Sequence, residues 1–251
     1  MTGNDPYGLR LLWDNLLKLY EVFSHICLQN ELRHYAAGGT ALGAVRHKGF
    51  IPWDDDFDVY MPRSDYERLY ALCTANNASP LKAVSLWTSH SYRLMFGKVF
   101  FSDETQVTGG VSPDSVFIDI FPLDGLPTNN CRFKMWILER ALRRRLITLC
   151  PNYSLKRRMR MSLEQWGKNW PYDESWYVQC YQENLCKIKD RLYTREMFGT
   201  AKWVAFDRIK IAVPEDVEGY LRAEFGDYMK LPPLEQRKPT HVRQIFKPTK
   251  V

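Results

Sequence analysis

The spacing of apolar residues along the chain predicts a series of helices. Over Leu9–Gln29 apolar side chains recur every three or four residues, which is typical of an amphipathic helix that covers a sheet. The same reasoning predicts helices over Ser64–Thr74, Arg132–Cys150 and Pro214–Phe225. One stripe of the third helix is formed by Met135, Leu138, Leu142, Leu146 and Leu149.

Strands are predicted where apolar and polar residues alternate, or where β-branched and aromatic residues gather between turn signals. Such segments are Phe57–Met61, Leu94–Phe101, Val116–Phe121 and Ile209–Val213. Together with the helices they predict an α+β fold, in which a mixed sheet is flanked by helices and a further helical segment lies in the C-terminal half.

Acidic residues crowd the start of the first of these strands. They fill four of five consecutive positions: Asp54, Asp55, Asp56 and Asp58. Alternate residues of a strand share a face, so Asp56 and Asp58 point one way while Phe57 and Val59 point to the core. Neighbouring carboxylates repel one another and are unfavourable near a core, which indicates that something positive lies opposite them.

A third acid, Asp119, interrupts the apolar strand Val116–Phe121. Asp56, Asp58 and Asp119 would together suit a hard divalent cation, Mg²⁺ or Mn²⁺, bound with phosphate oxygens and water. The alternatives are an acidic turn capped by arginines and a calcium loop, although the spacing of an EF-hand is absent. We expect the metal to be held jointly with a nucleotide.

A glycine turn precedes the acids. Gly38 and Gly39 suit a tight turn into a helix, and Thr40 can cap that helix or present its hydroxyl to a phosphate. The turn lacks the lysine of a P-loop and is weak evidence alone. In combination with D-x-D and a later acid, it matches the order found in nucleotidyltransferase folds, where backbone N–H groups of the turn hold the donor phosphates.

Several cations stand near this motif. Arg46, His47 and Lys48 lie between turn and acids, where they can neutralise a diphosphate or merely pair with the acids in a solvated loop. Lys98 lies in an apolar strand, where a lysine usually has a phosphate or an acid as its partner unless the strand is at the edge of the sheet. Trp53 can stack on a base, although packing in the core is the commoner use. Arg46, Lys48 and Lys98 are therefore candidate substrate ligands.

The positive charge of the chain is unevenly spread. The formal net charge is +6, and between Arg132 and Arg160 ten Lys or Arg stand against the single acid Glu139. A leucine stripe flanked by arginines suits a helix on anionic lipid or a groove for a polyanionic acceptor, and equally a merely solvated helix. No signature of a nucleic-acid-binding module is present, so we expect no nucleic-acid partner.

No segment reads as a signal peptide or approaches the roughly 20 apolar residues that a membrane span needs. The six cysteines form no C-x-x-C pair and are interpreted as reduced core thiols. We therefore expect a cytoplasmic protein, with peripheral contact at the inner face of the membrane through residues 132–160.

Three segments together resemble the LicD family, which also includes the fukutin-like transferases. They are GGTALGAVRHKGFIPWDDDFDVYMPRSDYERL, VFIDIFPLDGLP and IAVPEDVEGYLRAEFGDYMKLPP, in this order. The resemblance covers about residues 32 to 126 and 200 to 235, and its first block is the most specific. It divides the chain into a nucleotidyltransferase-like core over residues 1–130, a basic helical region over 131–195, and a strand-helix segment over 196–251 that completes the core.

The resemblance implies transfer of a phospho-alcohol group from a CDP-alcohol donor to a sugar hydroxyl, with release of CMP. The favoured donor is CDP-choline, and the acceptor is a cell-surface glycan or a lipid-linked precursor, such as lipopolysaccharide, teichoic acid or capsular polysaccharide. By position, Asp56 and Asp58 resemble the family's metal ligands. Asp119 resembles its third acid, which either binds the metal or takes the proton of the hydroxyl.

Two other functions use the same residues differently. A nucleotidyltransferase would move NMP from a nucleoside triphosphate to an alcohol and release pyrophosphate. A scaffold that binds a glycan or a membrane would keep the fold and catalyse nothing. The product distinguishes the first from transfer of a phospho-alcohol, and metal-dependent turnover distinguishes both enzymes from the scaffold.

Overall fold

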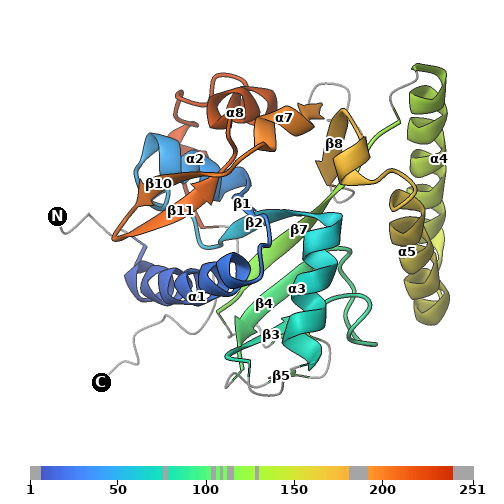
Figure 1. The fold of residues 1–251 in the computed structure, drawn as a ribbon, viewed down its shortest axis with the longest axis horizontal. Coiled ribbons are helices and arrows are strands. Elements are labelled where there is room, and N and C mark those ends of the chain that lie inside the picture. The colour runs from blue at the N-terminus through green and yellow to red at the C-terminus, as the bar shows by residue number, and fades with distance from the viewer. Residues whose placement is uncertain are drawn as a thin grey trace.

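The computed structural model describes residues 7–75, 79–102, 106–107, 110–111, 116–127, 130–180 and 192–239, and the α+β class is confirmed (Figure 1). Its helices are α1 (Arg10–Gln29), α2 (Gly38–Arg46), α3 (Arg63–Ala75), α4 (Asn130–Leu149), α5 (Tyr153–Gly167), α7 (Arg195–Phe198) and α8 (Val217–Phe225). Short 3-10 turns are η1 (Tyr172–Glu174) and η2 (Leu234–Gln236). The strands are β1 (Tyr35–Ala36), β2 (Asp58–Pro62), β3 (Leu81–Val84), β4 (Gly97–Phe101), β5 (Gln106–Val107), β6 (Gly110–Val111), β7 (Ile118–Gly125), β8 (Tyr177–Cys180), β9 (Tyr193–Thr194), β10 (Lys202–Phe206) and β11 (Ile209–Val213).

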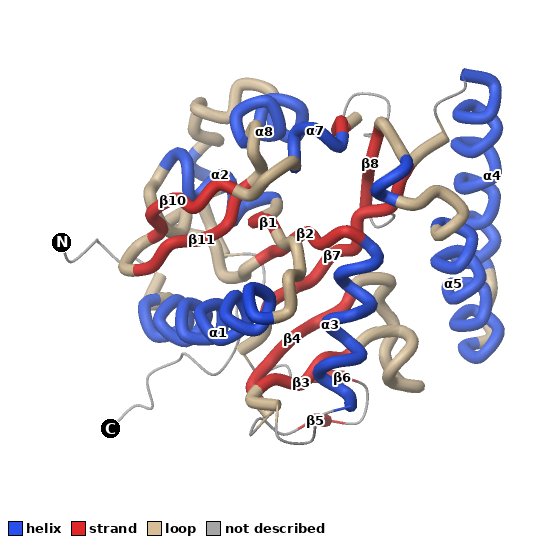
Figure 2. The backbone as a smooth tube through the Cα atoms, in the orientation of Figure 1, coloured by secondary structure: helices blue, strands red, loops and turns tan. Residues whose placement is uncertain are grey.

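The main sheet is mixed and is built around β7. Its order is β1-β2-β7-β4-β3, in which β2 is parallel to β7 and β4 is antiparallel to it. Beyond β4, the C-terminal half of β7 pairs with β8, which in turn pairs with β9. The hairpin β10-β11 packs against β1 and forms a sheet of its own (Figure 2).

Helices cover the sheet in two groups. Helices α1 and α3 pack on the central strands, and α1 buries the apolar stripe that its sequence predicts. Helices α2 and α8 gather with the hairpin at the β1 edge. A cluster of aromatic rings from these elements, including Tyr20, Phe23, Phe57 and Phe206, is fully buried. The start of β2 and β7 therefore lies on a rigid core.

The pair α4 and α5 stands at one side of the molecule (Figure 1). It is joined to the core by an ion-pair network in which Arg63 contacts both Asp124 of β7 and Glu164 of α5. Stacked tryptophans, Trp136 on α4 and Trp166 on α5, hold the two helices together. In the part of the chain that the structure describes, no helix has both the length and the apolar character needed to cross a membrane.

Three boundaries differ from the predictions by three or more residues. Strand β4 begins at Gly97 rather than Leu94, and α8 begins at Val217, because the Asp216 side chain accepts a hydrogen bond from Gly219 N–H and caps the helix there. Strand β7 continues to Gly125, four residues beyond Phe121, where the predicted strand ends. It does so because Pro122 falls between the residues that pair with β4 and those that pair with β8, so its missing N–H leaves no bond unmade there.

The cysteines are not uniformly in the core. Cys27, Cys73 and Cys180 are buried, as predicted, whereas Cys131 is exposed and Cys150 is half-buried. Cys186 lies outside the described residues. The expectation of core thiols is therefore wrong for Cys131, which lies in the first turn of α4.

Candidate active site

The structure brings Asp58 and Asp119 together. They are direct partners on the neighbouring parallel strands β2 and β7, so both side chains lie on the same side of the sheet. The backbone supports this register, because the Asp119 N–H donates to Phe57 O at 3.0 Å. On the other side of β2, the Ala37 N–H donates to Asp58 O at 3.0 Å. The D-x-D motif and the later acid thus meet at the start of two central strands.

Asp54 and Asp56 extend the acidic group. The side chains of Asp54 and Asp56 share a hydrogen bond, and burial together with the charge of Asp56 raises the pKa of Asp54 well above its ordinary value. Burial, followed by the charges of Asp56 and Asp119, likewise raises the pKa of Asp58. The acids are therefore desolvated and mutually repulsive, which is the condition that a bound cation would relieve.

Asp54 has a larger part in this group than the sequence reasoning assigned to it. The alternation of side chains along an extended segment indicates this part, because it places Asp54 on the same side as Asp56 and Asp58. Asp55, by contrast, is only 1% exposed. The Asp54 backbone is held by Trp13, whose indole N–H donates to its carbonyl at 2.8 Å.

The glycine turn packs directly on the acids. Helix α2 starts at Gly38, whose φ of +47° favours glycine. A Cβ at Gly38 would lie 3.4 Å from an Asp58 carboxylate oxygen, and one at Gly39 would lie 2.6 Å from Asp54 Oδ2. Since the first intrahelical bond is made by Ala41, the N–H groups of the preceding turn have no acceptor within α2.

Two side chains position this turn. Tyr220 of α8 accepts a hydrogen bond from Gly38 N–H at 2.8 Å, and Thr40 Oγ1 accepts one from Asp58 N–H at 2.9 Å. The cap position of α2 is Ala37 rather than Thr40. The Thr40 hydroxyl therefore ties α2 to β2, and the N–H groups of Gly39 and Thr40 are the groups suited to an anionic ligand.

We expect Gly39→Ala to lower activity about 100-fold with little loss of stability, because the new methyl group displaces the Asp54 carboxylate from its place beside Asp56. Thermal unfolding and turnover would be measured on the same preparation. In an Asp54→Ala background the clash has no counterpart, so Gly39→Ala should then change turnover little. Equal losses in both backgrounds would contradict the proposed contact.

Lys98 has an acid as its partner. It lies opposite Asp119 on β4, and its ammonium forms an ion pair with the Asp119 carboxylate. The same Nζ lies 3.4 Å from the centre of the Phe117 ring, a cation-π contact. The lysine thus lies beside the acids, where its positive charge offsets part of their mutual repulsion.

Arg46 and Lys48 are not brought to the acids. Arg46 ends α2, about 12 Å along the helix from Gly38, and its guanidinium donates to the carbonyl of Tyr228 at 2.7 Å. Lys48 is exposed in the following turn with φ +59°, and its carbonyl accepts a hydrogen bond from Asp207 N–H. Both residues stay predictions as phosphate ligands, with Arg46 the nearer to a cavity.

That cavity has a volume of about 490 Å³ and lies between α2 and the segment after α8. Trp53, which directly precedes the acids in sequence, lines it together with Arg46 and Tyr228. The Arg237 guanidinium lies 5.7 Å from the centre of the Trp53 ring. The size of the cavity, its aromatic walls and its basic groups suit a nucleoside or a similar flat polar ligand.

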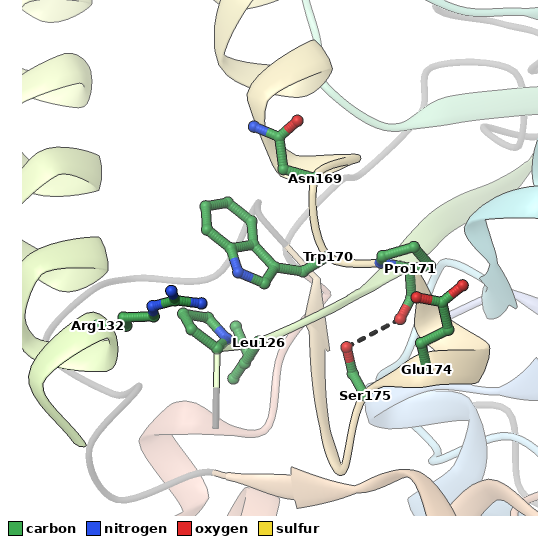
Figure 3. A pocket seen from close by; sticks show the side chains of 8 residues that line it. Leu126, Arg132, Asn169, Trp170, Pro171, Glu174 and Ser175 are labelled. Atoms are coloured by element: carbon green, nitrogen blue, oxygen red, sulfur yellow. Dashed lines mark hydrogen bonds between the residues drawn. The ribbon is translucent and has the colours of Figure 1, made fainter. Parts of the chain in front are cut away.

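A second cavity, of about 200 Å³, is remote from the acids (Figure 3). It lies beyond the end of β7, where Arg132 of α4 and Trp170 face each other across it. Six positions of β7 separate Asp119 from Gly125, a distance of about 20 Å. The second cavity is therefore outside reach of the acidic group.

The acids fit a hard divalent cation in donor type and charge. Carboxylate oxygens are the ligands that Mg²⁺ prefers. The pKa values of Asp54 and Asp58 are raised by burial first and then by neighbouring acids, and a bound ion would offset both effects. Among the described residues, no three acidic, histidine or cysteine side chains already converge as a finished metal site. Asp119, in particular, is engaged by Lys98.

Comparison with known proteins points to one family. Residues 31–145 match the model described as LicD/FKTN/FKRP, nucleotidyltransferase domain. The chain is 27% identical, over a 257-residue alignment, to the lipopolysaccharide cholinephosphotransferase LicD of Haemophilus influenzae, covering 92% of this chain and 94% of that protein. An uncharacterized protein of Rickettsia prowazekii is 30% identical over 86 residues, covering 26% of this chain and 32% of its own. One of Rickettsia typhi is 38% identical over 52 residues, covering 20% and 17%.

Proposed function

We propose that this chain is a LicD-family phosphotransferase, which moves phosphocholine from CDP-choline to a sugar hydroxyl of a cell-surface glycan or its precursor. The proposal is supported by the match of residues 31–145 to the LicD/FKTN/FKRP nucleotidyltransferase model. The relative from Haemophilus influenzae, aligned over nearly the whole chain, is named a lipopolysaccharide cholinephosphotransferase. The observation that carries the proposal is the register of Asp58 and Asp119, with Lys98 on Asp119 and the glycine turn packed on Asp54 and Asp58.

The reaction is proposed as an in-line displacement. The acceptor hydroxyl oxygen forms a bond to the phosphorus nearer the alcohol, the bond from that phosphorus to CMP breaks, and CMP leaves with the bonding electrons. Asp119, which forms an ion pair with Lys98, takes the proton of the hydroxyl or acts as a metal ligand. The N–H groups of Gly39 and Thr40 hold donor phosphate oxygens, and the cavity beside Trp53 holds the nucleoside.

Asp56, Asp58 and Asp119 would hold the divalent cation, Mg²⁺ or Mn²⁺. When bound, that ion supplies neutralisation of the diphosphate and of the charge that develops on the leaving group. Asp54 shares a hydrogen bond with Asp56 and so orients the Asp56 carboxylate. Carboxylates this close to one another repel each other, and a bound cation would offset that repulsion, which favours a role for them in binding one.

The test is product analysis with purified protein, lipopolysaccharide as the acceptor, and CDP-choline, CDP-ribitol, CDP-glycerol or CDP-ethanolamine as donor. We expect CMP release and labelled acceptor with CDP-choline, loss of both on chelation with EDTA, and recovery with Mg²⁺ or Mn²⁺. In a parallel reaction with CTP and phosphocholine, the release of pyrophosphate is measured. Release of pyrophosphate there, with no CMP from any CDP-alcohol, would instead establish a nucleotidyltransferase.

A further inference from the structure

Helix α4 presents its leucine stripe to solvent. Leu138, Leu142 and Leu149 are 71%, 57% and 67% exposed, and Met135 is 65% exposed. At 100° per residue these side chains, with Leu146, fall within one face of the helix. Figure 1 shows α4 as the outermost element on its side of the molecule, with no other ribbon beyond it. Scattered exposed leucines are ordinary, but a continuous helical stripe of them is not.

The leucine stripe does not pack against α5, because α5 contacts a different face of α4. The buried residues of α4 are Trp136, Arg140 and Ile147, which lie roughly opposite the leucines around the helix. Trp136 stacks on Trp166 of α5 with ring centres 5.9 Å apart. Among the residues that the structure describes, α4 thus packs on the protein through a face other than the leucine stripe.

Cations border the stripe along both edges. Lys134 and Arg145 lie on one side of it, and Arg132 and Arg143 lie on the other. The single acid of this region, Glu139, is already paired with Arg143 at 2.7 Å. An apolar stripe between two rows of cations is the pattern of a helix that lies in the headgroup region of an anionic membrane.

We propose that α4 docks the protein on an anionic phospholipid bilayer, with its leucines at the boundary of the acyl chains and its flanking cations on lipid phosphates. The helix is about 30 Å long and carries six Lys or Arg between Asn130 and Leu149, so it lies along the surface rather than across it. Each cation near the surface adds electrostatic attraction to anionic lipid.

Charge argues against a second copy as the occupant. Two α4 helices packed through their leucines would bring the basic edges of one against the basic edges of the other, with Glu139 already engaged. An anionic surface complements both edges at once. The proposal concerns membrane binding alone and does not rest on the transfer reaction, although an enzyme so docked would meet acceptors anchored in the same bilayer.

The experiment is sedimentation of the full chain with vesicles of phosphatidylglycerol mixed into phosphatidylcholine, and with vesicles of phosphatidylcholine alone. We expect binding to the anionic vesicles, weakened at least about 10-fold by added salt, by omission of phosphatidylglycerol, or by the variant Leu138→Gln/Leu142→Gln/Leu149→Gln. The matched control changes three leucines that are 61%, 59% and 76% exposed elsewhere, as Leu11→Gln/Leu28→Gln/Leu234→Gln, and it should bind as the wild type does.

Thermal unfolding of each variant shows that it is folded, and no CDP-alcohol is needed, so failure here is distinct from failure of the proposed function. No binding to anionic vesicles, or binding that the α4 variant leaves unchanged, would overturn the proposal. A dimer in sedimentation velocity that the α4 variant dissociates would also overturn it, in favour of a second copy.

Discussion

Asp58→Asn is expected to abolish transfer while the protein stays folded and at least as stable as the wild type. Asp58 is half-buried among acids, and the charges of Asp56 and Asp119 add to the effect of desolvation in raising its pKa. An amide at this position removes the repulsion and also removes the ligand. A loss of about 4 kcal/mol of transition-state stabilisation corresponds to about 1,000-fold in rate, and we expect at least this loss.

Turnover is measured as CMP release, and stability as the midpoint of thermal unfolding without added metal. Asp56→Asn should behave in the same way. Asp173→Asn is the matched control, since that carboxylate is exposed and pairs with Arg33 away from the acids, so its turnover should equal that of the wild type. Substantial CMP release by Asp58→Asn, or a large fall in its unfolding midpoint, would contradict the assignment of Asp58 as a metal ligand.

The acids show how far sequence reasoning reached. Period-two alternation correctly placed Asp56 and Asp58 on one face, and it would have added Asp54 had the extended segment been followed back by two residues. The pairing of Asp58 with Asp119 depends on which strands are neighbours, and a sequence does not show that when about 60 residues lie between them. That Lys98 pairs with Asp119, and not with a phosphate, likewise depends on which strands are neighbours, here β4 and β7.

The candidate cations show why nearness in sequence misleads. Arg46 follows the glycine turn by eight residues, but a helix fills that interval and carries Arg46 away from Gly38. Helix α4 gives the converse case, because its leucine stripe was visible in the sequence while the face that packs was not. The buried face of α4 carries Trp136, whose stacking partner Trp166 lies on α5 and was not identifiable from spacing.

Arg63→Ala is expected to destabilise the protein by about 3 to 5 kcal/mol, the range found when one partner of a buried ion pair is removed. Arg63 donates to both oxygens of Asp124, at 2.9 and 2.6 Å, and to Glu164 at 2.7 Å. Asp124 and Glu164 are each only 1% exposed, so neither is rescued by water when the guanidinium is gone. Arg63→Lys keeps the charge but lacks the planar guanidinium, so its stability should lie between that of the wild type and that of Arg63→Ala.

Urea unfolding at neutral pH measures the difference, with Arg222→Ala as the matched control. Arg222 pairs with Glu218 one turn away on α8, both side chains are largely exposed, and the loss there should stay below about 1 kcal/mol. An Arg63→Ala variant as stable as the control would mean that the network adds nothing to the attachment of α5.

The pH dependence of that variant identifies the cause. Burial already raises the pKa of Glu164, and Arg63 acts in the opposite direction, so its removal raises that pKa further. A carboxyl whose pKa is higher in the folded than in the unfolded state binds protons preferentially in the folded state, so stability increases as pH falls through the folded pKa. The deficit of Arg63→Ala should therefore shrink on acidification, because a protonated Glu164 no longer buries a charge. A deficit that is constant with pH would trace the loss to packing of the arginine stem against Tyr66, whose ring centre lies 5.4 Å from the guanidinium carbon, rather than to unpaired charge.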